Sequence, residues 1–423
     1  MTGGKGGKDP SATEPPARQG PRPLPLHLAT AFSTLMSSHG ALALSRSGSP
    51  PWREPLGKAS ALLEALESAD PDALNQAVAR EASHRLSAFV AGVEAYRKHS
   101  YRRSLPEPPC VWQEGSTRLL DYRRPGKSRK PALPLLVVPS LINRFWVLDL
   151  SERASFLRWL AERGVAPFVI DWGAPEALER GFSLSDYIAG RLEAALGVVL
   201  ALGGPPPLLL GYCMGGDLAL ALALRRQRDL AGLVLMATPW DFHSVNEPQA
   251  RCLAALLPIY EPLMTLIGEL PLDAIQALFS ALDPLLVMRK FVAFSRLDPE
   301  SPEAAAFVAL EDWLNDGVPL AAAVARECLG GWYGRNTTAA GDWRVAGEAM
   351  EPGRLELPSL VVVPERDRIV PPASAASLAE AIPDADRLTP GAGHIGLMVG
   401  GRAPKTVWQP ILTWLKERPA ASR

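Results

Sequence analysis

The sequence predicts an α/β fold with a mostly parallel β-sheet, and two patterns carry this prediction. Short apolar runs alternate with helix-like segments such as Ser151–Gly164 and Leu184–Leu202. Such alternation favours buried parallel strands with helices on both faces of the sheet. A cysteine between glycines also follows one of the runs directly, at the sheet edge where α/β folds place their sites. The runs are Leu135–Val138, Pro167–Ile170, Leu208–Leu210, Leu233–Met236 and Leu360–Val363.

Composition and charge exclude several classes of protein. The 423 residues are 47% hydrophobic and 21% charged, which is ordinary for a soluble globular protein. The formal net charge of −1 gives no overall field that would attract nucleic acid or an anionic membrane. The four cysteines lack the paired spacing of a zinc site or a disulfide framework, so we expect no metal and a reducing compartment. We find no signal-peptide pattern and no uncharged apolar stretch of the roughly 18–20 residues that span a bilayer, and we expect a soluble, cytoplasmic protein.

The N-terminal part predicts a tail and then a helical extension. Residues 1–25 are rich in Gly, Pro and Lys and are expected to be disordered, because they bury too little surface to offset the entropy of ordering. Residues 26–108 are expected to form a helical extension, with apolar residues at helical spacing through 58–101. Asp70 is placed to cap a helix that restarts at Pro71. This extension either packs on its own chain or docks a partner.

The predicted α/β core covers residues 109–240 and 355–423. It opens with two strand-like segments, Val111–Glu114 and Thr117–Tyr122, separated by Gly115–Ser116. This spacing predicts a β-hairpin at the entrance to the core.

The centre of the predicted core is the stretch that follows Leu208–Leu210. Gly211, Cys213 and Gly215 come next, and the Ala- and Leu-rich residues after them favour a helix. This pattern is typical of a nucleophile elbow, a sharp turn with no room for side chains at its two glycines, and cysteine stands where serine is usual. The N-terminus of the following helix favours a thiolate and stabilises an oxyanion. The alternative is a buried structural cysteine beside a glycine turn.

Partners for this cysteine occur downstream. Asp367 follows the apolar run at Leu360–Val363, and His394 follows in Gly393–Gly396. The chain order of nucleophile, acid and histidine is that of the α/β-hydrolases and differs from the orders in chymotrypsin and subtilisin. We therefore expect an α/β-hydrolase fold in which Cys213, Asp367 and His394 form a catalytic triad.

The alternation stops between residues 241 and 354, which predicts a cap inserted into the core. The stretch Arg251–Ser295 is rich in Leu, Ala, Ile and Met, and prolines interrupt it, so we expect a mostly helical cap. Its apolar residues either form an acyl-binding or interaction surface or simply pack against the core.

Further motifs lie outside the elbow. They are Pro139–Arg144 with Leu148–Leu150, Asp171–Gly173, Gly211–Gly216, Thr238–Phe242, Glu311–Trp313 with Asn315–Asp316, Asp367 with Val370–Pro372, and Gly393–Gly396. In these stretches, across residues 111–418, the chain resembles the polyhydroxyalkanoate synthases. It is most similar to the shorter, class III-like catalytic subunits, which work with a helper subunit.

The resemblance implies an acyltransferase that polymerises (R)-3-hydroxyacyl-coenzyme A into polyhydroxyalkanoate, poly-3-hydroxybutyrate being the familiar product, and releases coenzyme A. His394 would deprotonate Cys213, and the thiolate would attack the thioester to give an acyl-cysteine. A hydroxyl group would then attack this intermediate. Asp367 would orient His394 and, as is thought for the family, help to activate the hydroxyl.

The resemblance also implies an oxyanion hole and partners. The backbone N–H of Met214 would supply one half of the hole, and that of Ser140 or Leu141 the other half. We expect no cofactor, since coenzyme A enters as part of the substrate. The expected state is a homodimer, in the cytoplasm or at the surface of polymer granules, with a helper subunit as a further partner.

Two other functions stay open on the same residues. One is a cysteine hydrolase, either a thioesterase or a polyhydroxyalkanoate depolymerase, in which water instead of a hydroxyl reaches the acyl-cysteine. The other is a non-catalytic, granule-associated homologue that has kept the fold.

Several other residues are interpreted as structural. Asp149 and Asp171 fit hydrogen-bonding scaffold, Cys252 and Cys328 fit inert core thiols, and His243 fits a surface or supporting role better than the entrance of the cap. Trp332–Tyr333 either line the site or anchor a loop.

Overall fold

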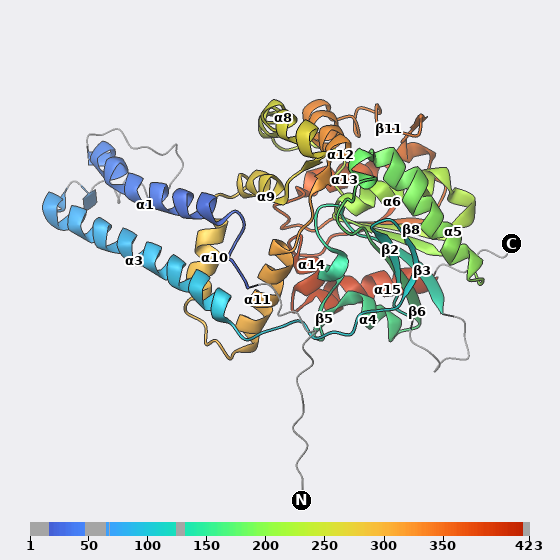
Figure 1. Cartoon of the computed structure of the whole chain (residues 1–423), viewed down its shortest axis with the longest axis horizontal. Coiled ribbons are helices and arrows are strands. Elements are labelled where there is room, and N and C mark those ends of the chain that lie inside the picture. The colour runs from blue at the N-terminus through green and yellow to red at the C-terminus, as the bar shows by residue number, and fades with distance from the viewer. Residues whose placement is uncertain (1–16, 47–64, 67, 124–131, 418–423) are drawn as a thin grey trace, which may run out of the picture. The chain divides into compact units, whose positions relative to one another are not determined.

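The computed structural model describes residues 17–46, 65–66, 68–123 and 132–417. The chain divides into two compact units, one of residues 1–101 and 284–308 and the other of residues 102–283 and 309–423. Figure 1 colours both along the chain. Residues 1–16 of the expected tail and 58–64 of the expected helical stretch lie outside the described residues.

The first unit is built from helices. α1 (Leu24–Arg46) lies beside α3 (Pro71–Lys98), and α3 packs on α10 (Leu286–Phe294). The predicted cap of α3 is present, because the Asp70 carboxylate accepts a hydrogen bond from the backbone N–H of Ala73 at 3.1 Å. α1 starts at Leu24, so Leu24 and Pro25, the last residues of the tail expected to be disordered, are helical instead.

Aromatic packing joins the N-terminal helices to α10. The ring of Phe291 meets Phe89 and Tyr96 edge to face, with ring centroids 6.2 and 5.8 Å apart. Gly92 faces the backbone carbonyl of Phe291, where any Cβ would clash, so the two helices approach closely. The helical extension therefore packs on its own chain, and residues 284–308 of the predicted cap belong to this unit.

An eight-stranded sheet forms the centre of the second unit, in the order β1-β2-β6-β3-β7-β8-β13-β14. β1 and β2 form the predicted antiparallel hairpin, β2 also pairs antiparallel with β6, and the remaining neighbours are parallel. The strands are β1 (Cys110–Glu114), β2 (Thr117–Asp121), β3 (Leu133–Val138), β6 (Val165–Asp171), β7 (Leu208–Tyr212), β8 (Gly232–Met236), β13 (Ser359–Val362) and β14 (Asp386–Leu388). Each predicted apolar run is a strand, which confirms the mostly parallel α/β-hydrolase sheet. β14 is not predicted by the sequence pattern, because this short edge strand carries two charged residues.

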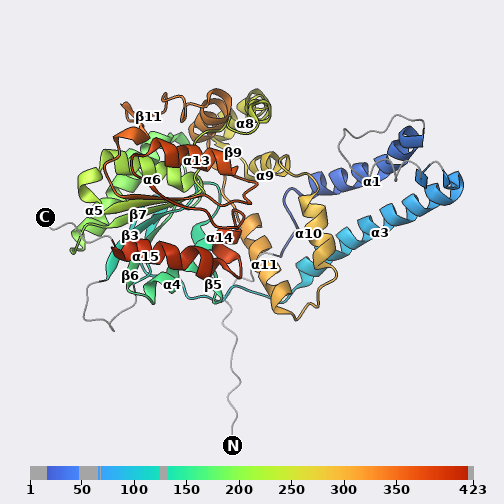
Figure 2. The ribbon, with the colours of Figure 1, turned by 180° about the vertical axis from the view of Figure 1, so that it is seen from behind.

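Helices cover both faces of this sheet. α5 (Glu193–Ala201), α6 (Met214–Arg225) and α13 (Pro372–Ala381) lie on one face, and α4 (Phe156–Ala161) and α15 (Gln409–Glu417) lie on the other (Figures 1 and 2). The predicted helix at Leu184–Leu202 forms as η3 (Asp186–Leu192) followed by α5. α14 (Gly396–Val399) and η7 (Pro404–Trp408) precede α15.

The predicted helix at Ser151–Gly164 is only partly correct. The chain first forms a small hairpin, β4 (Asp149–Ser151) and β5 (Ala154–Ser155), after the short helix η1 (Phe145–Leu148). α4 begins only after Ser155, whose hydroxyl accepts a hydrogen bond from the Arg158 backbone N–H at 3.1 Å. A serine at this position ends the extended segment and starts the helix.

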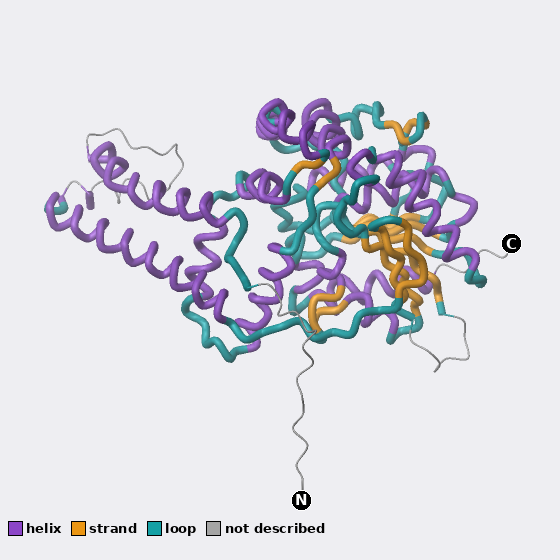
Figure 3. The backbone as a smooth tube through the Cα atoms, viewed as in Figure 1, coloured by secondary structure: helices purple, strands orange, loops and turns teal. Residues whose placement is uncertain are grey.

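The rest of the predicted cap is helical, with a few two-residue strands (Figure 3). Its elements are α7 (Glu247–Ala254), α8 (Leu257–Ile267), β9 (Glu269–Leu270), α9 (Leu272–Ser280), α11 (Pro302–Asn315), β10 (Leu320–Ala321), α12 (Ala322–Arg326), η5 (Glu327–Arg335), β11 (Arg344–Val345) and β12 (Glu348–Ala349). Short 3-10 turns also lie at Glu179–Gly181, Gln227–Asp229 and Pro352–Arg354.

One helical run in the described part of the chain, Glu247–Ile267, is long and apolar enough to cross a membrane by length and composition alone. Its mean hydropathy is 1.4, and 11% of the apolar window is buried. The prediction from the sequence concerned uncharged stretches, and this run does not contradict it because it contains Arg251 and Glu261. A single run of this kind is weak support for a membrane span, but it leaves Ile259 and Leu266 70% and 82% exposed.

Candidate active site

Cys213 lies at a sharp turn between β7 and α6. Its backbone φ and ψ are 57° and −134°, a conformation that non-glycine residues rarely adopt and that tertiary contacts must hold. The Cys213 backbone N–H donates to the carbonyl of Met236 on β8 at 2.9 Å, which ties the turn to the neighbouring strand. This geometry is that of a nucleophile elbow, and it presents the Cys213 side chain at the carboxyl edge of the sheet.

The glycines of the elbow are required by close packing. A Cβ at Gly211 would meet backbone atoms of Gly215 and Gly216 in the turn, and a Cβ at Gly215 would meet the carbonyl oxygens of Val138 and Pro139. Gly215 therefore brings the N-terminus of α6 against the end of β3. The partial positive charge of this helix end stabilises negative charge on the Cys213 sulfur.

Asp367 and His394 meet beside this turn. The Asp367 Oδ2 atom lies 2.7 Å from Nδ1 of His394, while Oδ1 accepts hydrogen bonds from the backbone N–H groups of Ile369 and Val370 at 2.8 and 2.9 Å. Both side chains are buried. The hydroxyl of Tyr212, next to the cysteine, donates to the His394 carbonyl at 3.2 Å. The structure thus brings together the acid and the histidine that the sequence pairs.

The charges of Cys213 and Asp367 affect the protonation of His394. Burial alone would lower the pKa of His394, but the negative charge of Cys213 and the hydrogen bonds to Asp367 and Cys213 raise that pKa to about 10. The imidazole therefore holds a proton when Cys213 is a thiolate. Nδ1 faces Asp367, so Nε2 is the nitrogen left for the sulfur.

Asp217 is a further buried acid, and no sequence pattern marks it as part of the site. It lies one turn after Cys213 on α6 and is fully buried. Burial and then the negative charge of Cys213 raise its pKa well above the ordinary value, which favours the neutral carboxyl. A neutral group here avoids a second negative charge close to the thiolate.

The loop after β3 lies next to the elbow, as the contacts of Gly215 require. The indole N–H of Trp172 donates to the Pro139 carbonyl at 3.0 Å, and that of Trp313 donates to the Arg144 carbonyl at 2.8 Å. The Asp171–Gly173 and Glu311–Trp313 motifs thus hold this loop from two sides. Met214 begins α6, and Ser140 and Leu141 are buried in the loop. That their backbone N–H groups form an oxyanion hole stays a prediction.

A cavity of about 190 Å³ opens over Cys213. The elbow contributes Cys213 and Met214, and the loop after β3 contributes Ile142. Most of the other lining residues come from the segment after β8 and from the cap, a contribution that is not readable from the sequence. They include Pro239, Phe242, Val245, Leu253, Phe279, Trp332 and Tyr333. Of the two readings of Trp332–Tyr333, the one in which they line the site is correct.

His243 supports this wall and is absent from the cavity lining. Its Nε2 atom lies 2.8 Å from the carbonyl oxygen of Tyr333, and its backbone N–H donates to Asp241 at 2.9 Å. Asn336 donates to the same Asp241 oxygen at 2.8 Å and accepts from the Phe242 backbone N–H at 3.0 Å. These contacts agree with the supporting role expected for His243.

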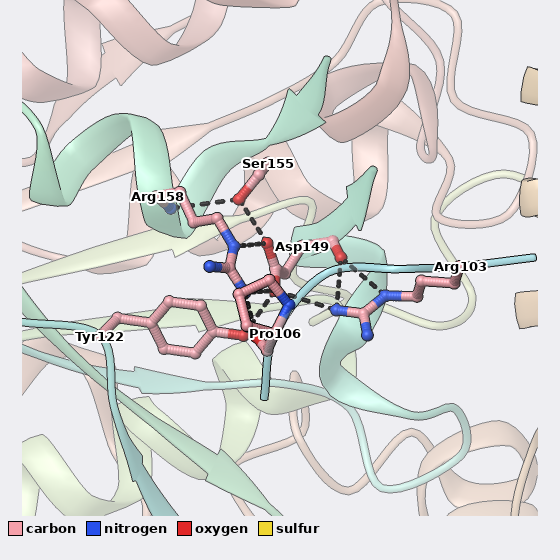
Figure 4. A network of polar contacts seen from close by, with 6 residues as sticks. All are labelled: Arg103, Pro106, Tyr122, Asp149, Ser155 and Arg158. Atoms are coloured by element: carbon pink, nitrogen blue, oxygen red, sulfur yellow. Dashed lines mark hydrogen bonds and ion pairs between the residues drawn. The ribbon is translucent and has the colours of Figure 1, made fainter. Parts of the chain in front are cut away.

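Asp149 is the centre of a polar network away from the cysteine (Figure 4). Its fully buried carboxylate accepts hydrogen bonds from Arg103 at 2.9 Å, from Arg158 at 2.8 and 3.0 Å, from the Tyr122 hydroxyl at 2.8 Å and from the Ser155 hydroxyl at 2.5 Å. Asp171 likewise pairs with Arg118 at 2.6 Å. Both aspartates are scaffold, as interpreted from the sequence.

The other cysteines differ in exposure. Cys328 on η5 is buried, and burial raises the pKa of its thiol well above the ordinary value. Cys252 is exposed on α7, so its interpretation as a core thiol is wrong: that part of α7 faces outward. Cys110 is exposed as well. Within the described residues no group of three or more His, Cys, Asp or Glu side chains could hold a metal ion.

Comparison with known proteins relates this chain to one group of enzymes. The family model "Poly-beta-hydroxybutyrate polymerase (PhaC) N-terminus" matches residues 107–160. The poly(3-hydroxyalkanoate) polymerase subunit PhaC of Haloferax mediterranei is 29% identical over 73% of this chain, and the match covers 63% of that protein, less than two thirds of its length. The corresponding subunits of Synechocystis sp. and Allochromatium vinosum are 27% and 29% identical over 73% of this chain and are covered to 84% and 88%.

Solved structures that were matched to this chain include Est816, described as an N-acyl homoserine lactone degrading enzyme, at 16% identity and a TM-score of 0.45. That match covers 73% of this chain and 99% of Est816. An α/β hydrolase fold protein from Nakamurella multipartita is 16% identical with a TM-score of 0.43 and covers 74% of this chain.

Proposed function

We propose that this chain is an acyltransferase, because it has the α/β-hydrolase fold and is a relative of the poly(3-hydroxyalkanoate) polymerases. It polymerises (R)-3-hydroxyacyl-coenzyme A into polyhydroxyalkanoate and releases coenzyme A. The observation that carries the proposal is the grouping of Cys213 with the hydrogen-bonded pair His394 and Asp367 under a cavity whose lining is mostly apolar.

In the first step Cys213 becomes acylated. Nε2 of His394 takes the thiol proton, and the sulfur attacks the thioester carbonyl carbon. The oxyanion that forms is stabilised by the backbone N–H of Met214 and by that of Ser140 or Leu141. The carbon–sulfur bond to coenzyme A then breaks, and the leaving thiolate takes the proton from His394.

In the second step the acyl group passes to a hydroxyl. The hydroxyl oxygen of a monomer or of the growing chain attacks the acyl-cysteine, its proton moves to His394, and the Cys213 thiolate leaves. Asp367 holds His394 in the required orientation and contributes to activating the hydroxyl. Water has to be kept out at this stage, and the apolar side chains of Phe242, Leu253 and Phe279 around the sulfur support such exclusion.

The proposal extends to location and partners. We place the enzyme in the cytoplasm at the surface of polymer granules, because the exposed apolar residues of the run Glu247–Ile267 suit contact with a hydrophobic polyester. Val245, which is 64% exposed, lines the Cys213 cavity and adjoins this run. A homodimer, and activation by a helper subunit, complete the proposed working state.

Incubation with 3-hydroxybutyryl-coenzyme A tests the proposal. Thiol release together with polymer supports it, while thiol release with free 3-hydroxybutyrate identifies a thioesterase. Release of acid from added polymer, without activity on the thioester, identifies a depolymerase. No reaction with either substrate identifies a non-catalytic homologue. Cys213→Ala is the control for release that does not depend on the enzyme.

A further inference from the structure

A second cavity lies beside the one above Cys213. Its volume is about 70 Å³, and it shares Ile142, Leu253, Phe279, Leu282, Cys328 and Tyr333 with the first cavity. Because these six residues line both cavities, the second cavity lies next to the space that a group on the Cys213 sulfur would enter. The second cavity continues away from the sulfur, between α9, β9, β10 and the junction of α12 with η5.

The second cavity is an apolar chamber. The residues found only in its lining are all aliphatic, namely Leu270, Ile275, Leu278, Leu320, Ala325 and Leu329. Five of the six are buried, and none of the described residues that line the chamber is charged. A cavity lined in this way does not retain ordered water and favours an apolar occupant.

The chamber is larger than a methyl group needs. One water, about the size of a methylene group, needs on the order of 10–15 Å³ of such volume. The 70 Å³ chamber therefore has room for about five to seven methylene-sized groups. A 3-hydroxybutyryl group carries only a methyl group on C3 and would leave most of it empty.

We propose that this chamber receives the C3 side chain of the acyl group on Cys213, and that the enzyme prefers 3-hydroxyacyl groups with side chains of three to five carbons. This inference rests on the proposed function and adds to it the class of acyl group. Each buried methylene raises kcat/KM about fourfold, so two extra methylenes are worth about fifteenfold. The increase in kcat/KM stops when the side chain is too long to fit in the chamber.

The test compares 3-hydroxybutyryl-coenzyme A with 3-hydroxyhexanoyl-coenzyme A on the full chain, by thiol release in single turnovers and at steady state. We expect kcat/KM to be about fifteenfold higher for the hexanoyl substrate. Equal values, or a preference for butyryl, overturn the inference and leave the proposed function intact. Release from neither substrate overturns the proposed function and this inference with it.

Two variants locate the preference in the chamber. Ala325→Val narrows the chamber and is expected to lower the hexanoyl-to-butyryl ratio of kcat/KM severalfold. Leu329→Ala enlarges the chamber and is expected to extend the preference to 3-hydroxydecanoyl-coenzyme A, whose side chain has seven carbons, so the two changes act in opposite directions. Ala323→Val is the matched control, on the same helix but outside both cavity linings. A ratio that shifts equally in the control, or in neither chamber variant, overturns the inference.

Discussion

The two carboxylate oxygens of Asp367 have different hydrogen-bond partners. Oδ2 lies 2.7 Å from Nδ1 of His394, and Oδ1 is held by two backbone N–H groups of its own loop at 2.8 and 2.9 Å. The loop therefore fixes the carboxylate, and the carboxylate fixes the ring. Since Nδ1 is occupied in this way, His394 can exchange a proton with Cys213 only through Nε2.

Cys213 should be the residue that carries the acyl group. After reaction with a 3-hydroxyacyl-coenzyme A, peptide mass spectrometry is expected to find a stoichiometric acyl adduct at Cys213. Cys213→Ala should abolish coenzyme A release. Cys213→Ser should keep weak activity at most, because serine is a poorer nucleophile in a site that favours a thiolate. An adduct on Cys110, Cys252 or Cys328 would contradict the assignment.

The two partners of the cysteine should affect different steps. His394→Ala is expected to remove acylation, which needs the thiolate. Asp367→Asn is expected to slow steady-state polymerisation by about 10²–10⁴-fold. It should slow single-turnover acylation less, because Asp367 both orients His394 and helps to activate the hydroxyl. Equal losses in the two measurements would reduce Asp367 to an orienting role.

The raised pKa of His394 predicts a pH dependence of stability. The folded-state pKa of about 10 lies above the ordinary value of 6.5. The protonated ring therefore contributes stability that is complete below pH 6.5 and is lost as the pH rises through about 10. We expect the unfolding temperature of the wild-type chain to fall over this range more steeply than that of His394→Gln.

The cause of this shift can be tested separately. Cys213→Ala removes the negative charge that is the largest of the influences raising the pKa of His394. The NMR titration of the His394 ring, identified by its absence in His394→Gln, is then expected to move to lower pH. An unchanged titration in Cys213→Ala would show that the cysteine carries no charge in the free enzyme.

The network around Asp149 should be critical for stability. Asp149→Asn leaves Arg103 and Arg158 without their carboxylate partner, and breaking a buried pair in this way costs roughly 3–5 kcal/mol. Denaturant unfolding measures the loss. Glu81→Gln, which breaks an exposed pair with Arg85 on α3, is the control and should change little. A small effect at Asp149 would mean that water or other groups replace its charge.

The proposed homodimer can be examined by light scattering of the full chain with and without a substrate analogue. We expect a dimer whose population grows when the analogue is present. A strictly monomeric chain that polymerises at full rate, without a lag, would rule out the proposal. If a chain shortened to begin at Pro108 is insoluble, the N-terminal helices serve as core, in agreement with the packing of α3 on α10.

Local and short-range patterns were sufficient to predict the sheet and the elbow. The turn requires glycine at 211 and 215 because backbone atoms close by leave no room for a Cβ atom. An apolar run such as Leu208–Leu210 indicates a buried strand even when the strands that pair with it are unknown. Cys213, Asp367 and His394 each follow a strand of the parallel part of the sheet. Because these strands end at the same edge, residues far apart in the sequence are expected to meet there. The cap of α3 at Asp70 was also predictable, since it involves only residues three apart.

Contacts between distant segments decided the rest. Nothing near Pro284 in the sequence indicates that residues 284–308 pack with the N-terminal helices, because the pairing depends on how Phe291 meets Phe89 and Tyr96. Cys252 and Cys328 lie in similarly apolar stretches, yet one is exposed and the other is buried. The chamber beside Cys213 likewise needs Leu270, Leu320 and Leu329 to converge from three elements. Apolar composition determines that such side chains are buried, but only the tertiary packing decides which of them leave a space between them.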